Sequence, residues 1–430
     1  MAGAIVQRLQ SPPVKLRIAL CAALGLALAQ AASHAADPVV AAAGDIACEP
    51  SNPNFNGGNG TAFACRMKDT SDLLLGGGYD AVLLLGDNQY LDGSLANYRT
   101  VFAPTWGRLG PLLRPAPGNH EYVTPGATGY YDYFGAAAGD RTQGWYSYDL
   151  GTWHVIVLNS NCGDIGGCGP GSPQLRWLTD DLATHPRACT LAYWHHPRFS
   201  SGPHGDDGTY DAFWRTLYDA GADVVLAGHD HDYERFAPQT PSGAADPEHG
   251  IREFVVGTGG RETRPFVTVD LNSQVRNDID LGVLKLRLRA DGYDWQFLPV
   301  PGGSFTDAGS AGCHNPPDAT SIPLDRGRFK AEVTWSSFDG TTGLGKAAGP
   351  AADGSGLFWF FASDNWELLV KVLDGCPLNN RYWVFSAATT NVGYTLTVTD
   401  TLTGKTARYE NPLGRSSPAV TDVGALAVCP

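Results

Sequence analysis

One strand-like run that ends in polar residues indicates how this chain folds. Residues 81–90 read AVLLLGDNQY: five apolar residues, a glycine, and then a carboxylate, two amides and a phenol. An unbroken apolar run of this length is typical of a strand buried on both faces, as in a parallel sheet. We therefore expect Asp87 and Tyr90 to lie at the carboxyl end of a buried strand, which is the edge where α/β sheets bind ligands.

The same arrangement recurs four times, although the run 112–116 is less apolar than the others. Side chains that can bind metals follow each run. The motifs are Gly44-Asp45 after 39–43, Gly118-Asn119-His120-Glu121 after 112–116, His195-His196 at the end of 190–194, and Gly228-His229-Asp230-His231 after 222–227. Each motif alone is weak evidence, since a Gly-Asp or an Asn-His pair is common in turns and caps. Together, oxygen and imidazole donors at one sheet edge suggest a site for two metal ions.

Helix signals alternate with these strands. Ser172-Pro173 is a good helix start, because a capping hydroxyl precedes a proline in the first turn, and this helix should run to about residue 184. Other expected helices span 66–75 and 210–220, a hairpin spans 145–150 and 153–158, and later strands span 253–256, 283–288 and 293–297. Helices on both faces of largely parallel strands predict an α/β layered fold.

The composition changes after residue 300. The segment 301–326 is rich in Pro and Gly and has no periodic pattern, so we expect a linker there. Beyond it, apolar residues alternate with polar ones and helix signals disappear. We expect 37–300 to be a catalytic domain and 327–430 to be a small all-β accessory domain, most simply a sandwich.

The first 35 residues resemble an export signal. A basic start precedes an apolar stretch at 18–32 that is too short for a comfortable membrane span, and Ser33-His34-Ala35 fits a cleavage site. An uncleaved anchor is the alternative. We expect residues 1–35 to be a signal peptide and the protein to be secreted or periplasmic, without stable membrane insertion.

Composition and charge narrow the class of protein. Apolar residues make up 43% of the chain and charged residues 17%, which suits a folded enzyme with a sizeable core rather than a disordered chain. The formal net charge is −14 at pH 7, so binding of nucleic acid through the overall field is not expected.

Eight cysteines follow the expected signal, and export would allow them to form disulfides. Their positions suggest Cys48 with Cys65, Cys162 with Cys168, and Cys376 with Cys429. Cys189 is expected to be a buried free thiol, and Cys313 has no obvious partner. A zinc cluster is the rival interpretation, but the chain contains no CxxC pair.

Two metal ions hydrolyse a phosphate ester by binding both the attacking and the leaving oxygen. Such a centre needs a carboxylate shared between the ions, and Asp87 is the natural candidate. His229 and His231 are two positions apart, so in an extended segment they point the same way and can reach different ions. A metal-bound hydroxide would attack phosphorus, and a histidine would protonate the leaving alkoxide.

These motifs resemble the calcineurin-like metallophosphoesterase superfamily over residues 38 to about 300, and in detail its purple acid phosphatase branch. Most of the superfamily has a histidine two residues after the first Asp, whereas this branch lacks it and has a Tyr in the second motif. Here Ala47 and Tyr90 stand at those places, although the branch usually has Gly where Ala47 is. The resemblance implies helices flanking two central sheets, with the β domain added after them.

The resemblance also implies the roles of individual residues. It places Asp87 between two metal ions, His120 beside the phosphate as the catalytic histidine and, more loosely, His204 as a substrate-binding residue. The first ion would take Asp45, Tyr90 and His231, and the second would take Asn119, His195 and His229. Phenolate favours a hard ion, so Fe(III) is expected in the first site, with Zn, Mn or Fe(II) in the second.

We therefore expect a secreted phosphoesterase with two metal ions that acts on phosphate monoesters of small molecules. A phosphodiesterase acting on nucleotides or phospholipid headgroups is the alternative enzyme, because the same ligands serve both reactions. The alternative of another class is a metal-bound adhesion or binding protein without catalysis. Among nearby residues, Glu121 is expected either to hydrogen-bond near His120 or to lie at the surface, and His196 is expected to be a spectator. The sequence gives no prediction of the oligomeric state.

Overall fold

The computed structural model describes Met1 and residues 36–429, apart from 186, 315–319, 326–327, 349–353 and 363–364. The expected signal peptide therefore lies almost entirely outside the described residues. Within the described residues, no helix combines the length and the apolar character needed to cross a membrane.

The first sheet carries three of the five motifs. Its strands run in the order β13-β12-β11-β1-β2-β3, and β1, β2 and β3 are parallel to one another while the other pairs are antiparallel. The predicted runs 39–43 and 81–85 form strands with those same bounds. The strands of this sheet are β1 (Val39–Ala43), β2 (Ala81–Leu85), β3 (Leu113–Ala116), β11 (Gly282–Arg289), β12 (Gly292–Pro299) and β13 (Ala308–Gly312).

The second sheet carries the other two motifs. Its order is β10-β8-β9-β7-β6-β5-β4, with β5, β6, β7 and β9 parallel and the edge strands antiparallel. The predicted hairpin at residues 145–158 forms its β4–β5 edge. The strands are β4 (Tyr146–Leu150), β5 (Trp153–Val157), β6 (Cys189–Tyr193), β7 (Val224–Ala227), β8 (Tyr233–Phe236), β9 (Arg252–Val256) and β10 (Ser273–Asn277).

The two sheets pack face to face, and alternating side chains separate the inner core from the outer face. In β5, Val155 and Val157 join the core shared with β1, β2 and β11, whereas Ile156 and Leu158, the residue after the strand, join a second cluster on the other face of the sheet. This alternation follows from the two-residue period of a strand. Strands buried on both faces are continuously apolar, which is the pattern that the sequence shows.

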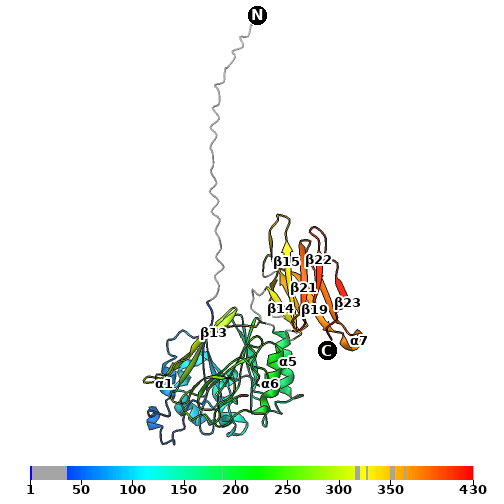
Figure 1. Ribbon diagram of the computed structural model, residues 1–430. Helices are drawn as coiled ribbons and strands as arrows, with labels where there is room; N and C mark the ends of the chain where they lie inside the picture. The colour runs from blue at the N-terminus through cyan, green and yellow to red at the C-terminus, as the bar shows by residue number, and fades with distance from the viewer. Residues whose placement is uncertain are drawn as a thin grey trace. The chain divides into compact units, whose positions relative to one another are not determined.

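Helices cover the outer face of the second sheet. α5 (Pro173–Thr184) and α6 (Asp211–Asp219) contribute Leu178, Phe213 and Trp214 to the outer cluster, and Figure 1 shows the two helices side by side. α5 begins where predicted, and the Ser172 side chain accepts a hydrogen bond from the Leu175 amide. Further α-helices before residue 300 are α1 (Met67–Asp72), α2 (Leu95–Asn97), α3 (Asn119–Tyr122) and α4 (Thr128–Phe134).

A buried histidine fastens α5 to the β4–β5 hairpin. His154 is 1% exposed, and its Nδ1 lies 3.0 Å from Asp149 Oδ1 while its Nε2 lies 2.8 Å from Asp181 Oδ2. Ser147 also donates to Asp181, over 2.8 Å. Burial disfavours the charged ring, but the carboxylates of Asp181 and Asp149 outweigh it and raise the pKa of His154 above its ordinary value of 6.5.

This arrangement predicts a pH dependence of stability. A raised pKa in the folded state means that the contribution of His154 is complete below pH 6.5 and is lost as the pH rises through the folded-state pKa. Removing the charged hydrogen bonds should cost about 1.5–3 kcal/mol of unfolding free energy at pH 6, and less at pH 9. Denaturant unfolding of His154→Gln and the wild type at both pH values measures this difference. An equal cost at pH 6 and pH 9 would contradict it.

The segment expected to be a linker contains strand structure, and this part of the prediction is wrong. Residues 308–312 form β13, which pairs with β12 and extends the first sheet. Asp307 accepts hydrogen bonds from Tyr233 and Arg235, both over 2.7 Å, so the segment is joined to the second sheet as well. The strand reads AGSAG and therefore carries no apolar alternation that would reveal it.

Four disulfides occur among the described residues, and three of them are the expected pairs: Cys48–Cys65, Cys162–Cys168 and Cys376–Cys429. The fourth joins Cys189 to Cys313, so the prediction of a free thiol is wrong. These two cysteines are 124 positions apart and meet because β13 brings Cys313 beside the start of β6. Spacing along the chain contains no signal for such a pair.

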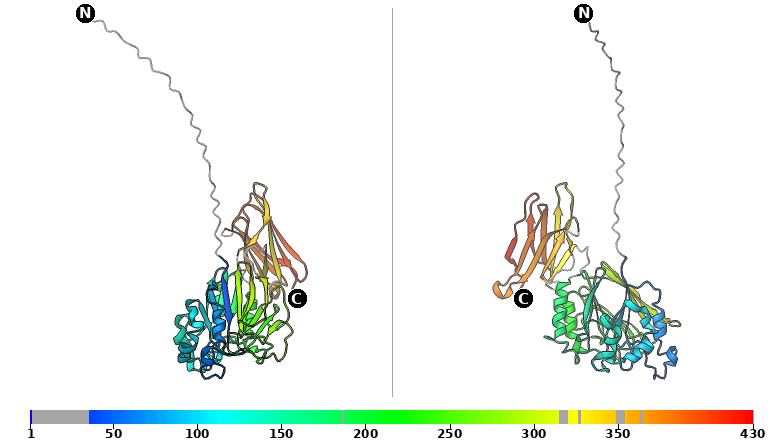
Figure 2. Two further views of the ribbon diagram at one scale, coloured as in Figure 1. Left: turned by 90° about the vertical axis from the view of Figure 1, so that its left-hand side faces the viewer. Right: turned by 180° about the vertical axis from the view of Figure 1, so that it is seen from behind.

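The C-terminal part is built mainly from strands, as predicted, and these strands are antiparallel and form two sheets (Figure 2). Their shared core contains Phe329, Val333, Val370 and Val384 and draws only on residues 322–429. One sheet contains β14 (Ser321–Leu324), β15 (Phe329–Ser336), β16 (Thr342–Leu344), β21 (Gly393–Asp400) and β22 (Thr406–Asn411). The other contains β17 (Lys346–Ala347), β18 (Ser355–Trp359), β19 (Trp366–Asp374), β20 (Tyr382–Ala388) and β23 (Val420–Leu426), with α7 (Cys376–Asn379) between β19 and β20.

Candidate metal centre

The five motifs follow the carboxyl ends of β1, β2, β3, β6 and β7. The seven side chains proposed as ligands form two groups of donor atoms, one around Tyr90 and one around His195, and Asp87 belongs to both. Sheet edges from both layers contribute to each group, so the folded layers are needed to assemble them.

The first group surrounds the hydroxyl oxygen of Tyr90. Asp45 Oδ1 lies 2.7 Å from it, Asp87 Oδ2 lies 3.0 Å away, and His231 Nε2 lies 3.1 Å away. All four side chains are at most 2% exposed. This is the set of residues proposed for the first ion.

The second group surrounds Nε2 of His195, which is fully buried. Asn119 Oδ1 and His229 Nδ1 each lie 3.2 Å from it, and Asp87 Oδ2 lies 3.3 Å from it. The same oxygen of Asp87 therefore contacts both groups. This is the position required of a carboxylate that bridges two cations.

Charge in the two groups favours cations. Burial disfavours a charged His195, yet the Asp87 carboxylate outweighs it and raises the pKa of His195 to about 9. Burial likewise opposes a charged His231, and Asp45 raises the pKa of His231 to about 9. Buried carboxylates require a positive partner, and metal cations placed among these oxygen and nitrogen donors would provide it. The donor set therefore fits two metal ions.

The carboxylates around Tyr90 act on its phenol in the opposite direction. Burial, and then Asp45 and Asp87, raise the pKa of the Tyr90 phenol well above its ordinary value, so the phenol keeps its proton and donates a hydrogen bond to Asp45 Oδ1. A cation at this position would reverse the balance, because direct bonding to a highly charged ion stabilises the phenolate.

Backbone geometry at the motifs places the ligands under constraint. Asp45, Asp87 and His229 all have positive φ, at 59°, 48° and 70°. Such conformations are uncommon outside glycine and concentrate at functional sites. Gly118 allows a further close approach, because a Cβ there would lie 2.1 Å from Asp87 Oδ1. The Gly before Asn119 is therefore required by space.

Hydrogen bonds behind the ligands fix their orientation. His195 Nδ1 lies 2.8 Å from the Leu85 carbonyl, so it donates there and leaves Nε2 free for a metal ion. The His229 amide donates to Asp45 Oδ2 over 2.8 Å, and the His120 amide donates to Asp87 Oδ1 over 2.9 Å. The carboxylates of Asp45 and Asp87 are thereby held in place.

Two partly exposed histidines lie beside the groups without joining them. His120 Nδ1 lies 2.6 Å from the Leu91 carbonyl, its ring packs 4.3 Å from Tyr90, and its Nε2 is 3.8 Å from Asp87 Oδ2. His204 Nδ1 lies 2.6 Å from Asp230 Oδ1, and its ring stacks 3.9 Å from that of His229. With Nδ1 engaged, each histidine can present Nε2 to a substrate.

Two residues support the donor groups from behind. Glu121 is fully buried and accepts hydrogen bonds from the amides of Asn88, Gln89 and Gly118, so it hydrogen-bonds near His120, as one of the two expectations had it, and a surface position is excluded. Arg261 packs its guanidinium 4.8 Å from the Tyr90 ring centroid. Sequence reasoning missed Arg261, because no motif indicates a contact that depends on packing between distant segments.

Comparison with known proteins agrees with the geometry. Residues 39–233 match the family model of the calcineurin-like phosphoesterases. This segment is therefore similar to a calcineurin-like phosphoesterase domain. It ends just after the last proposed ligand, His231, and so contains every proposed ligand.

The relatives place the domain near the purple acid phosphatases. Purple acid phosphatase 22 of Arabidopsis thaliana is 29% identical over 206 residues, covering 42% of this chain and 44% of that protein. Human acid phosphatase type 7 is 30% identical over 227 residues, covering 44% of this chain and 50% of that protein. The chain thus spans half the length of these relatives or less.

A solved structure shows the same fold. A purple acid phosphatase from yellow lupin seeds superposes with a TM-score of 0.53 at 18% identity, covering 64% of this chain and 53% of that one. The prediction of an α/β layered phosphoesterase fold is confirmed.

Proposed function

We propose that this chain is an exported phosphoesterase that binds two metal ions and hydrolyses phosphate monoesters. The observation that carries the proposal is the shared oxygen of Asp87, which lies 3.0 Å from Tyr90 Oη in one donor group and 3.3 Å from His195 Nε2 in the other. The calcineurin-like phosphoesterase domain supports the same reaction. The disulfides suit a protein that folds outside the cytoplasm.

The two bound cations and two histidines would have separate roles in the reaction. Two bound cations would polarise the phosphate and generate a nucleophile from water at neutral pH. His120 would protonate the leaving oxygen, because its Nδ1 is already engaged by the Leu91 carbonyl and its ring is 25% exposed. His204, anchored on Asp230, would donate to a phosphate oxygen.

The proposed function is tested with two substrates and one chelator. Purified protein should hydrolyse an aryl phosphate faster than a bis-aryl phosphate. Activity should disappear after chelation and return when iron is added together with zinc or manganese. Faster hydrolysis of the diester would support the phosphodiesterase alternative. Metal binding without hydrolysis of either ester would support the non-catalytic alternative.

Tyr90 gives a prediction about the first ion. We propose that it binds Fe(III) as phenolate, with its pKa lowered far below the free value of about 10. Iron-loaded protein should then absorb visible light through phenolate-to-iron charge transfer, and Tyr90→Phe should be colourless. Tyr130→Phe is the matched control, since Tyr130 is equally buried but donates to the Pro115 carbonyl. An unchanged spectrum in Tyr90→Phe would remove Tyr90 from the ligand set.

The C-terminal strands should be dispensable for catalysis. Every proposed ligand lies before residue 232, and the core of residues 322–429 is built from its own strands. A chain ending after His314 keeps β13 and the Cys189–Cys313 disulfide. It should retain full aryl phosphatase activity and metal content. Loss of activity in a folded, metal-loaded truncated protein would show that the C-terminal strands help to form the substrate pocket.

A further inference from the structure

The imidazole of His229, a proposed ligand of the second ion, packs against two other rings. His204 stacks on it with a centroid distance of 3.9 Å and an interplanar angle of 29°. His196 packs against it at 4.4 Å with an angle of 52°. His229 is thus prevented from turning away from His195, whose Nε2 lies 3.2 Å from His229 Nδ1.

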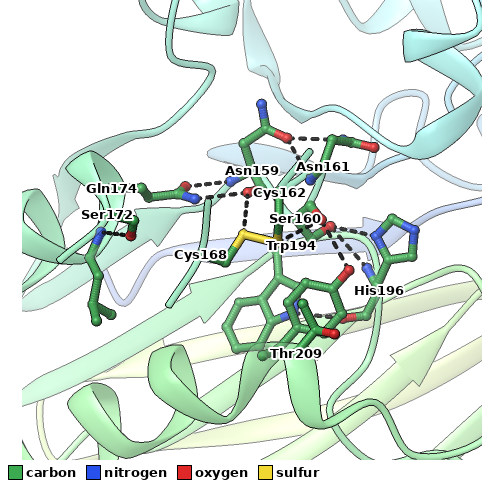
Figure 3. The surroundings of a disulfide bond; sticks show 12 residues. Asn159, Ser160, Asn161, Cys162, Cys168, Ser172, Gln174, Trp194, His196 and Thr209 are labelled. Atoms are coloured by element: carbon green, nitrogen blue, oxygen red, sulfur yellow. Dashed lines mark hydrogen bonds between the residues drawn. A yellow bond between two sulfur atoms is a disulfide. The ribbon is translucent and has the colours of Figure 1, made fainter. Parts of the chain in front are cut away.

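His196 is itself fixed by several contacts. Its Nδ1 lies 2.7 Å from the Ser160 hydroxyl, and its backbone amide donates to the same oxygen over 3.2 Å. Its carbonyl accepts from Trp194 Nε1 over 2.7 Å. Its ring also stacks on that of Tyr210, with a centroid distance of 5.6 Å and an interplanar angle of 18°. Figure 3 shows the His196 ring directed at the Ser160 hydroxyl.

Ser160 lies between the end of β5 and Cys162, just before the loop that the Cys162–Cys168 disulfide closes. Gln174 of α5 hydrogen-bonds both the amide and the carbonyl of Asn159, over 2.7 and 2.8 Å (Figure 3). Tyr210 donates to the Ser160 carbonyl over 3.0 Å. The position of Ser160 is therefore set by the disulfide, by α5 and by Tyr210.

We infer that His196 is a positioning residue for the second ion, and that the segment at residues 159–168, which includes the disulfide-closed loop, holds it through Ser160. The inference rests on the proposed two-metal function. It also assigns a role to a histidine that the sequence suggested was a spectator.

The effect should be confined to the second ion. The ligands of the first ion have other supports: Arg261 packs on Tyr90, and the Arg261 amide donates to the Asp45 carbonyl over 2.9 Å. Cys48, next to Ala47 in the first motif, is tied by its own disulfide to Cys65. Neither support involves Ser160 or His196.

Zinc affinity provides a test that is independent of catalysis. Competition with a chromogenic chelator should give two dissociation constants for the wild-type protein. In His196→Ala, one of them should rise about 10- to 100-fold, the usual effect of removing a residue that orients a metal ligand, while the other stays unchanged. Ser160→Ala keeps the His196 ring but removes its hydrogen bond, so the same dissociation constant should rise by a smaller factor.

A double variant and a pair of disulfide variants sharpen the test. Adding Ser160→Ala to His196→Ala should cause no further loss, because Ser160 acts through His196. Cys162→Ser/Cys168→Ser should weaken zinc binding at the second site. Cys376→Ser/Cys429→Ser, the matched control in the C-terminal strands, should leave zinc binding at both sites unchanged. Circular dichroism confirms that each variant is folded.

Several outcomes would overturn the inference: unchanged zinc affinity in folded His196→Ala and Ser160→Ala, equal weakening of both ions, or fully additive losses in the double variant. These outcomes leave the proposed function intact if the wild-type protein still binds two ions and hydrolyses the ester. A wild-type protein that binds no zinc would instead refute both the proposed function and this inference.

Discussion

Asp87→Asn should abolish nearly all phosphatase activity and release one or both metal ions. The substitution keeps the shape of the side chain and can still accept the hydrogen bond from the His120 amide, which is 2.9 Å from Asp87 Oδ1. It removes the negative charge from the oxygen that contacts both donor groups. Because the carboxylate would neutralise two cations at once, we expect kcat to fall by a factor of ~1000 or more.

Elemental analysis and aryl phosphate turnover measure this result on the same sample. Asp223→Asn is the matched control, because Asp223 is also buried but lies before β7, at the opposite end from the motifs, and accepts from the Thr190 amide. The control should keep its ions. Full metal retention and normal turnover in Asp87→Asn would rule out the bridging role.

His120→Ala should retain both ions but lose about 100-fold or more in kcat, the scale expected for a positioned proton donor. His120 contacts Tyr90 and Asp87 through its ring and amide, yet its ring nitrogens do not belong to either donor group. The loss should be largest for alkyl phosphates and smallest for aryl phosphates with acidic leaving groups, which depart without a proton.

A series of esters with leaving groups of increasing pKa tests this role. The logarithm of kcat should fall more steeply with leaving-group pKa in the variant than in the wild type. His185→Ala is a suitable control, since His185 is 48% exposed and lies at the end of α5. An equal loss for every leaving group would assign His120 to phosphate binding instead.

The fold was predictable where hydrophobic pattern and local chemistry agree. Residues 81–85 are expected to form a strand and do form β2 with the same bounds. A short apolar run that ends in Gly-Asp is typical of a buried strand. The start of α5 followed from Ser172 and Pro173 for the same reason. β13 escaped prediction because an edge strand of small residues is recognised only by its pairing with β12.

The candidate site was predictable in its donors but not in its supports. All seven proposed ligands lie in two contacting groups at the carboxyl ends of strands, although these strands belong to two sheets rather than to one. Arg261 and Ser160 reach the site only through tertiary contacts. Ser160, for example, is 36 positions from His196. The Cys189–Cys313 pair escaped for the same reason, since it links the beginning of one strand to the end of another.

Metal content tests the central claim most directly. Protein produced with iron and either zinc or manganese available, then freed of loosely bound ions, should contain about two ions per chain by elemental analysis. One of the two should be iron. Removing them should abolish aryl phosphatase activity, and restoring them should recover it. A folded protein that binds fewer than one ion per chain, or that hydrolyses the ester equally well without metal, would contradict the two-metal account.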